Sequence, residues 1–178
     1  MSTPAPVITI PAVLGDGSLA PIEKMEAHRR GQLHLAVSVF LFDATRRLLI
    51  QRRAAGKYHC PGQWANTCCT HPHWGEAPAR AAERRLDEEL GIRGIALEER
   101  RTVDYRAEVG NGLIEHERVS MYTRTVDAEA LRHALNPDEV DAIAWVTPAE
   151  LARMRADEPD ALTPWFRIYF DRFPDLQI

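Results

Sequence analysis

Residues 75–92 have the sequence GEAPARAAERRLDEELGI, and this stretch carries the strongest fold signal in the chain. Its apolar residues recur at helical spacing and form one stripe, which consists of Ala79, Ala82, Leu86 and Leu90. Gly91 is a typical residue just beyond a helix end. We therefore predict an amphipathic helix over Glu76–Leu90. Its Arg and Glu residues four apart fit either an ordinary salt-bridged surface or a carboxylate-rich helix that holds Mg²⁺.

Strand and helix signals alternate through the rest of the chain. Leu33–Phe42 is a nearly continuous apolar run, as in a buried strand. Asn111-Gly112 between two strand-like runs predicts a hairpin. The other elements that we predict are strands over Arg47–Gln51, Trp64–Cys69, Val103–Val109, Leu113–Thr125 and Ile143–Val146, a short helix over Asp127–Leu135, and two helices begun by Thr147 and Thr163. The order predicts an α/β domain, with a mixed β-sheet flanked by helices and mostly non-sequential pairing.

Length and charge limit the class of protein. The 178 residues suit one domain, predicted over residues 23–178 after a loose tail and a turn in residues 1–22. A net charge of −4 argues against nucleic-acid binding, so an anionic ligand needs a local cluster of Lys and Arg. We see no secretory signal and no apolar run long enough to cross a membrane, and expect a cytoplasmic protein. The chain has three cysteines, which are Cys60, Cys68 and Cys69. Because this number is odd, at least one thiol is expected to be free.

Two short motifs combine residue types used in catalysis. Cys69 and His71 point to one side if their segment is extended, and a thiol beside an imidazole can be a nucleophile, a proton donor or a metal site. Glu115 and Glu117 share one face of a predicted strand, where two carboxylates favour a cation between them. Taken alone, each motif is more often structural: a buried Cys with a chance surface His, or a solvated strand face.

Histidines extend the possible metal site. His34 begins the predicted buried strand, where a lone His is more often a hydrogen-bonded core residue than a ligand. With His28 and the two motifs above, however, the chain offers three imidazoles and two carboxylates, which suit a divalent ion such as Zn, Mn or Fe. The candidate ligands are His28, His34, His71, Glu115 and Glu117.

Basic and aromatic residues complete the candidate set. Arg52, Arg53 and Lys57 lie in a predicted loop, with Lys24 upstream, and such a cluster fits a diphosphate or an ordinary basic surface equally well. Tyr105 and Trp165 are single aromatics that are more often core than catalytic, although Trp is the best ring for stabilising a cation.

Residues 75–92 resemble a Nudix box, in which a Gly is followed by a Glu, then Arg-Glu, two Glu and a Gly. The chain departs from that pattern at Ala81 and Arg85, where the family has Glu. These losses argue against ordinary Nudix hydrolysis, because acidic residues there bind the hydrolytic metals.

Over most of its length, roughly Glu23–Phe170, the chain resembles the type I isopentenyl-diphosphate isomerases of the Nudix superfamily. The ordered landmarks of this resemblance are Glu23-Lys24 with His28, Leu33–Ala36, Gln51–Ala54 with Lys57, Pro61-Gly62, Trp64–Asn66, Cys69–Pro72, Tyr105–Ala107, Glu115–Glu117 and Thr163–Trp165. Each landmark is weak alone, and the ordered set is highly specific.

The resemblance implies that isopentenyl diphosphate becomes dimethylallyl diphosphate, a step of isoprenoid biosynthesis, by protonation and deprotonation through a tertiary carbocation. Cys69 would work on one face of the substrate and Glu117 on the other. Tyr105 would hydrogen-bond to Glu117, and Trp165 would face the cation through its ring.

The resemblance also implies two metal ions and a phosphate site. The five His and Glu ligands named above would hold a divalent ion, Mn²⁺ or Zn²⁺. Mg²⁺ would bridge the diphosphate to Glu89 and the main-chain carbonyl of Cys69. The phosphates would be held by Lys24, Arg53, Lys57 and Arg85. The expected partner is therefore a small prenyl diphosphate, and we expect a monomer.

Two alternatives remain at this point. A Nudix pyrophosphohydrolase acting on nucleoside diphosphate derivatives would need the acids that Ala81 and Arg85 replace. A non-catalytic metal-binding or interaction module would have no use for intact Cys69 and Glu117.

Overall fold

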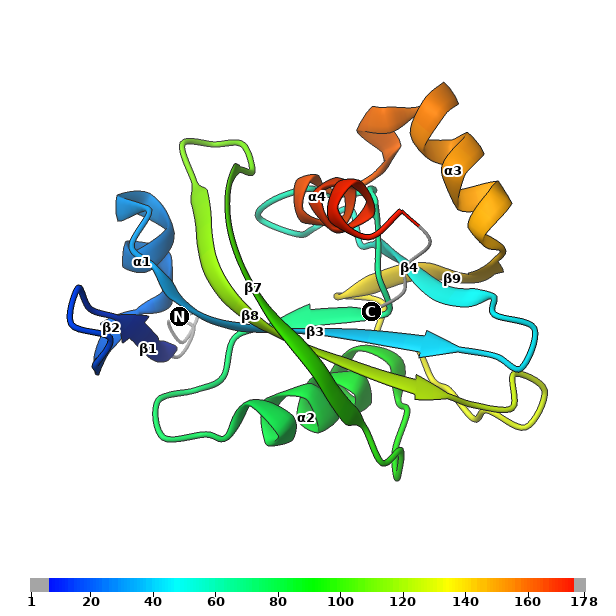
Figure 1. The fold of residues 1–178 in the computed structure, drawn as a ribbon, viewed down its shortest axis with the longest axis horizontal. Helices are drawn as coiled ribbons and strands as arrows, with labels where there is room; N and C mark the ends of the chain where they lie inside the picture. Colours follow the sequence, from blue (N-terminus) through cyan, green and yellow to red (C-terminus); the bar gives the residue numbers. More distant parts are fainter. Residues whose placement is uncertain (1–6, 175–178) are drawn as a thin grey trace, which may run out of the picture.

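A computed structural model describes residues 7–174. The strands are β1 (Thr9–Val13), β2 (Leu19–Glu23), β3 (His34–Phe42), β4 (Leu48–Arg53), β5 (Trp64–Ala65), β6 (Cys68–Thr70), β7 (Glu98–Glu108), β8 (Ile114–Thr125) and β9 (Val140–Val146). The helices are α1 (Lys24–Arg30), α2 (Pro78–Leu90), α3 (Pro148–Asp157), the 3₁₀ turn η1 (Pro159–Ala161) and α4 (Pro164–Arg172). Strands and helices interleave along the chain (Figure 1), which confirms the predicted α/β class.

Strand β3 organises the sheet. It pairs in parallel with β8, with His34 opposite Glu117, and antiparallel with β6, with Ser38 opposite Cys69. β8 forms a long antiparallel hairpin with β7, as its Asn-Gly turn predicted. At this turn Asn111 has φ 55° and Gly112 has φ 71°, the left-handed conformation that these residues tolerate best. The pairing is mostly non-sequential, as predicted.

Two layers of helix cover opposite faces of the sheet (Figure 1). On one face, α2 packs Leu86 and Leu90 against the side chains of Val37 and Val39 from β3. On the other face, α4 contributes a second apolar cluster that includes Trp165, Phe166, Tyr169 and Phe170. Side chains alternate along β3, so one strand serves both layers. This arrangement places α4 over the face that carries His34 and Ser38.

Several predicted segments differ in the structure. Arg52 and Arg53, predicted in a loop, are the last residues of β4, and Trp64–Cys69, predicted as one strand, is divided between β5 and β6. Thr9–Val13, predicted within a loose tail, forms β1. It is a strand because it pairs antiparallel with β2 and because Ala12 pairs with His34 of β3. Asp127–Leu135, predicted as a short helix, has one turn over residues 128–130 and is otherwise irregular. The backbone amides of Ala134 and Asn136 instead donate to carbonyls of α2 residues Leu90 and Glu89, at 2.7 and 3.0 Å. Tertiary contacts therefore override the helical pattern. The first part of the predicted tail, residues 1–6, lies outside the described residues.

Both C-terminal helices begin where predicted, but the threonines that precede them differ in their capping hydrogen bonds. Thr147 forms a full capping box with Glu150, whereas the Thr163 side chain makes no capping hydrogen bond. Within residues 7–174, none of the helices is both long and apolar enough to cross a membrane.

Candidate active site

A cavity of about 760 Å³ collects the candidate residues from distant parts of the chain. Its walls come from β1, α1, β4, β6, α2, β7, β8 and α4 and from the loops after β4, after β6 and before β9. All predicted site residues line it except His28 and His34, which are fully buried beside it. The lining members of the predicted set are Lys24, Arg53, Lys57, Cys69, His71, Arg85, Glu89, Tyr105, Glu115, Glu117 and Trp165.

Four buried residues form a compact group of ligand types: His28, His34, His71 and Glu117. One ligand atom from each residue lies within 4.8 Å of the ligand atoms of the other three. Two ligands on opposite sides of one divalent ion are about 4.4 Å apart, so this spacing is close to that of a metal site. The parallel register of β3 and β8 puts His34 beside Glu117, and His71 Nε2 lies 2.8 Å from Glu117 Oε1. Burial lowers the pKa of His71 to about 3, so its ring is neutral, as a ligand requires.

Main-chain contacts fix the tautomers of two of these rings. His28 Nδ1 lies 2.7 Å from the Lys24 carbonyl, and His34 Nδ1 lies 2.7 Å from the Gln32 carbonyl. A carbonyl only accepts, so each Nδ1 carries a proton and each Nε2 presents a lone pair. Among residues 7–174 neither Nε2 has a partner within hydrogen-bond distance, although both are buried and His34 Nε2 lies 3.7 Å from Glu117 Oε1. Metal-ligating histidines have this arrangement, so the group fits a divalent ion.

Glu115 and Glu117 share a hydrogen-bond donor. The Tyr105 hydroxyl lies 2.7 Å from Glu115 Oε2 and 2.8 Å from Glu117 Oε2. Burial and the charge of Glu117 raise the pKa of Glu115 well above its usual value. Burial also acts on Glu117, but interactions with His34 and His71 outweigh it and lower the pKa of Glu117 well below its usual value.

Glu115 does not belong to the compact group of four. Its Oε1 accepts a hydrogen bond from His59 Nε2 at 2.9 Å. Its role as a fifth metal ligand stays a prediction.

The Cys69 thiol is held in a polar niche on the α4 side of the sheet. Cys69 Sγ donates to Asn66 Oδ1 at 3.0 Å and lies 3.3 Å from Ser38 Oγ, which in turn lies 2.9 Å from the Tyr169 hydroxyl. Burial raises the pKa of Cys69 to about 12, and the neighbouring Glu117 adds to this effect. Cys69 is therefore held as a neutral, protonated thiol.

Cations line another part of the cavity. Burial, together with the charges of Lys57 and Arg85, lowers the pKa of Lys24 to about 8. Lys57 forms an ion pair with Glu139, and Arg85 pairs with Glu139 as well, at 3.1 Å. A single carboxylate thus holds two of the cations expected to bind phosphate.

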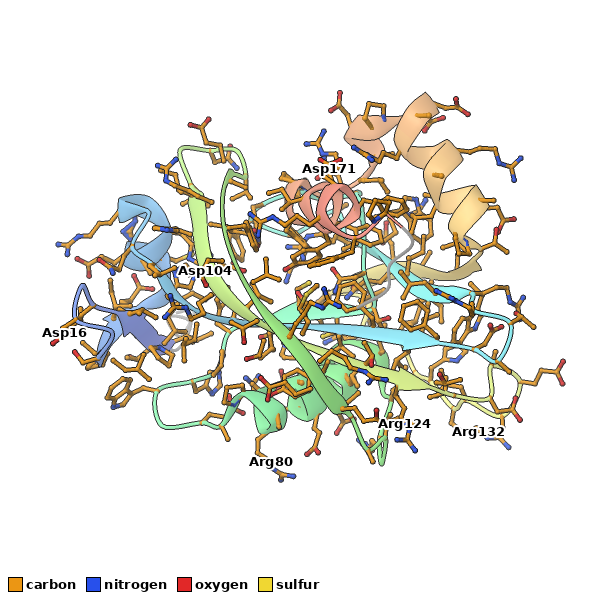
Figure 2. The ribbon with its side chains drawn as sticks, in the orientation of Figure 1. Asp16, Arg80, Asp104, Arg124, Arg132 and Asp171 are labelled. Atoms are coloured by element: carbon orange, nitrogen blue, oxygen red, sulfur yellow. The ribbon has the colours of Figure 1, made fainter. Side chains whose placement is uncertain are left out.

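Glu89 and Arg85 pair with each other at the end of α2. Glu89 Oε2 also accepts from Gln51 Nε2 at 2.8 Å. Arg85 is therefore half-buried against the carboxylate that follows it by one helical turn. Arg80, by contrast, lies on the solvent side of α2 (Figure 2) and is 76% exposed.

Trp165 closes the cavity on the α4 side. It is 2% exposed, and the Arg53 guanidinium lies 5.3 Å from its ring centroid. Its ring can therefore face a cation.

Comparisons with known proteins bear on this site. The model of the NUDIX domain family matches residues 32–166, more than half of the chain. A curated isopentenyl-diphosphate Delta-isomerase of Cereibacter sphaeroides is 54% identical over 154 residues, which cover 86% of each chain. Another, from Jannaschia sp., is 49% identical over 162 residues, which cover 90% of each chain. The chain belongs to the isopentenyl-diphosphate Delta-isomerase family of NUDIX-domain proteins.

Solved structures confirm the fold of this isomerase-family chain. A structure from Deinococcus radiodurans matches with a TM-score of 0.72 at 18% identity, covering 92% of this chain and 98% of the other. The MutT protein from Methanosarcina mazei Go1 matches with a TM-score of 0.61, also at 18% identity, covering 80% and 93%. Such low identities show the Nudix fold alone.

The sequence assigned no role to several residues around the site of this family member, although two of them, Gln51 and Asn66, lie within landmarks of the resemblance. They are Ser38, Gln51, His59, Asn66 and Glu139, which contact the predicted residues as described above. Ser38 had a usable signal, because it is a polar residue inside the apolar run of β3. His59 and Glu139 lie in or next to loops, where no periodicity marks the inward side.

Proposed function

We propose that this chain interconverts isopentenyl diphosphate and dimethylallyl diphosphate by adding a proton to one carbon and removing one from another. The observation that carries the proposal is the pairing of a neutral thiol, Cys69, with an ionised carboxylate, Glu117, in one cavity with a cation cluster. Curated relatives that are 49% and 54% identical are isopentenyl-diphosphate Delta-isomerases. An isomerase needs both a proton donor and a proton acceptor, and this cavity has both.

The substrate chemistry explains this arrangement. An isolated alkene is a weak base, so a donor must lie against its terminal methylene in a site that excludes water. Protonation there gives a tertiary carbocation, and loss of a proton from the adjacent methylene gives the product. We assign these two transfers to Cys69 and Glu117, on opposite faces of the substrate. The Tyr105 hydroxyl orients Glu117, and the Trp165 ring stabilises the positive charge between them.

The His28, His34, His71 and Glu117 group would hold one divalent ion, with Glu115 as a fifth ligand. We propose Mn²⁺ or Zn²⁺ there, because imidazoles with carboxylates suit both ions. The ion would tune the acidity of Glu117. The Nδ1 contacts of His28 and His34 keep both rings turned with Nε2 toward the site.

Diphosphate binding is assigned to the cation cluster. Lys24, Arg53, Lys57 and Arg85 would hold the phosphate oxygens, with Glu89 and the Cys69 carbonyl holding Mg²⁺ against them. Arg85 stands where a Nudix hydrolase has an acid, so it exchanges a metal ligand for a phosphate contact. The proposed partner is thus a small prenyl diphosphate.

Purified chain should convert isopentenyl diphosphate to dimethylallyl diphosphate when supplied with Mg²⁺ and Mn²⁺. In deuterated water the product should carry deuterium on carbon, which hydrolysis cannot produce. Cys69→Ala should lose at least about a hundredfold in kcat, because it removes the proton donor. Cys60→Ala is the matched control, since Cys60 is a buried thiol that does not line the cavity. Release of phosphate without deuterium in carbon, or full activity of Cys69→Ala, would rule the proposal out.

A further inference from the structure

His59 lies in the loop between β4 and β5, and none of the motifs assigned to the site includes it. It is 6% exposed, and its side chain contacts both a carboxylate, Glu115, and a cation, Arg53. Its Nε2 lies 2.9 Å from Glu115 Oε1, and its Nδ1 lies 3.3 Å from Arg53 Nη2. The ring thus lies between the carboxylate pair and the cation cluster.

The partners fix which ring nitrogen carries the proton. An Arg guanidinium only donates, so His59 Nδ1 accepts from Arg53. The proton is therefore on Nε2, which donates to Glu115. His59 makes a second contact with Arg53, because the Nε and Nη2 atoms of Arg53 donate to the His59 carbonyl at 3.3 and 3.2 Å. One residue therefore sets both the position and the direction of the guanidinium.

Packing keeps the ring in this orientation. The Tyr58 ring stacks on it with a centroid distance of 4.3 Å, and the Trp165 ring lies at 5.7 Å. Among the residues that the structure describes, the other side-chain donor to Glu115 is Tyr105, which it shares with Glu117. Without His59, Glu115 Oε1 would be a buried acceptor that has lost its partner.

We propose that His59 is a positioning residue that orients Glu115 through Nε2 and Arg53 through Nδ1, joining the metal site to the diphosphate site. This inference rests on the function proposed above for the same cavity. Outer partners of metal ligands usually contribute about 10- to 100-fold to metal affinity, so the contribution is measurable.

Two substitutions separate the two contacts. The amide nitrogen of Gln in His59→Gln reaches the place of Nε2 and can still donate to Glu115. The amide oxygen of Asn in His59→Asn takes the place of Nδ1 and can still accept from Arg53. His59→Ala removes both contacts, and His133→Ala controls for loss of an exposed histidine elsewhere.

Two titrations read the contacts separately on the full chain, after dialysis against a chelator. Mn²⁺ binding, followed by electron paramagnetic resonance, should weaken about 10- to 100-fold in His59→Asn and stay unchanged in His59→Gln. Inorganic pyrophosphate binding in Mg²⁺ buffer, followed by calorimetry, should weaken about tenfold in His59→Gln and stay unchanged in His59→Asn. His59→Ala should weaken both, and His133→Ala neither.

The crossed pattern supports the proposal. A His59→Asn or His59→Gln variant that matches the parent in both titrations overturns it. So does an equal loss of both affinities in the two variants with a lowered Tm, which would mean a purely structural role. If the parent makes no dimethylallyl diphosphate, the proposed function fails, yet the two titrations still decide the role of His59.

Discussion

Lys24 shows how burial sets the working range of a single residue. Its folded pKa of about 8 lies below the usual 10.5, first because of burial and then because Lys57 and Arg85 repel its charge. The ammonium form is therefore present below pH 8 and lost above it. We expect the KM for isopentenyl diphosphate to rise as the pH increases through about 8, because the neutral amine no longer attracts phosphate.

Steady-state kinetics between pH 6.5 and 9.5 (roughly the range over which a group of this pKa titrates) tests this expectation. Lys24→Arg serves as the matched variant, since a guanidinium keeps its charge throughout. It should remove the rise in KM above pH 8. A rise that is identical in the parent and in Lys24→Arg would show that another group titrates.

Arg85 supports a second prediction at the same scale. Its guanidinium lines the cavity and pairs with Glu89 and Glu139, whereas Arg80 on the same helix points to solvent. Arg85→Gln should raise the KM about tenfold or more, because a charge-assisted phosphate contact is lost. Arg80→Gln should leave the KM at the parent value. Equal effects of the two substitutions would contradict the assignment of Arg85 to phosphate.

At the scale of the element, the end of α2 depends on Gly91. Gly91 has φ 64°, and a Cβ added there would lie 2.8 Å from backbone atoms of Ala134. Gly91→Ala should therefore lower the free energy of unfolding by about 2–4 kcal/mol, through backbone strain and the clash together. The measurement is urea denaturation followed by circular dichroism.

Gly94 is the matched control for this substitution. It has φ 71°, but a Cβ there meets nothing within 4 Å. Gly94→Ala should lower the free energy of unfolding by about 1 kcal/mol, the cost of the left-handed conformation alone. If both substitutions cost the same, the contact between residue 91 and the segment around Ala134 is not important for stability.

Elements with a strong local pattern could be predicted from the sequence. The α2 stripe, the apolar run of β3 and the Asn-Gly hairpin of β7 and β8 all matched. Thr9–Val13 could not be predicted, because its strand exists only through pairing with β2 and with His34. The helix predicted over Asp127–Leu135 was wrong for the same reason, because backbone amides of this region bind the carbonyls at the end of α2.

Some residues of the site could likewise be predicted from the sequence, and others could not. Cys69, Glu117 and the histidines were predicted because their ordered motifs resemble a known family, and the structure brings them into or beside one cavity. His59 and Glu139 were missed because each contacts a site residue far away in sequence. Glu115 lies 56 residues from His59, and Lys57 lies 82 residues from Glu139, so only the folded chain brings them together. The Nudix-like box predicted the fold correctly and would have suggested hydrolysis if Ala81 and Arg85 had been ignored.

At the scale of the whole molecule, α1, β3, β8 and the segment after β6 meet at the group of four ligand types, so a bound ion should tie them together. An ion that binds only the folded state at about 100 times its Kd adds about 2.7 kcal/mol to the free energy of unfolding. For a domain of this size we expect Mn²⁺ to raise the Tm by about 5–10 °C and a chelator to reverse the change. His28→Ala should abolish the Mn²⁺-dependent rise whatever its own Tm, because an unpaired Nε2 of the group is removed, while His133→Ala should keep it. A parent Tm that is the same with Mn²⁺ and with chelator would contradict a metal site that spans these four elements.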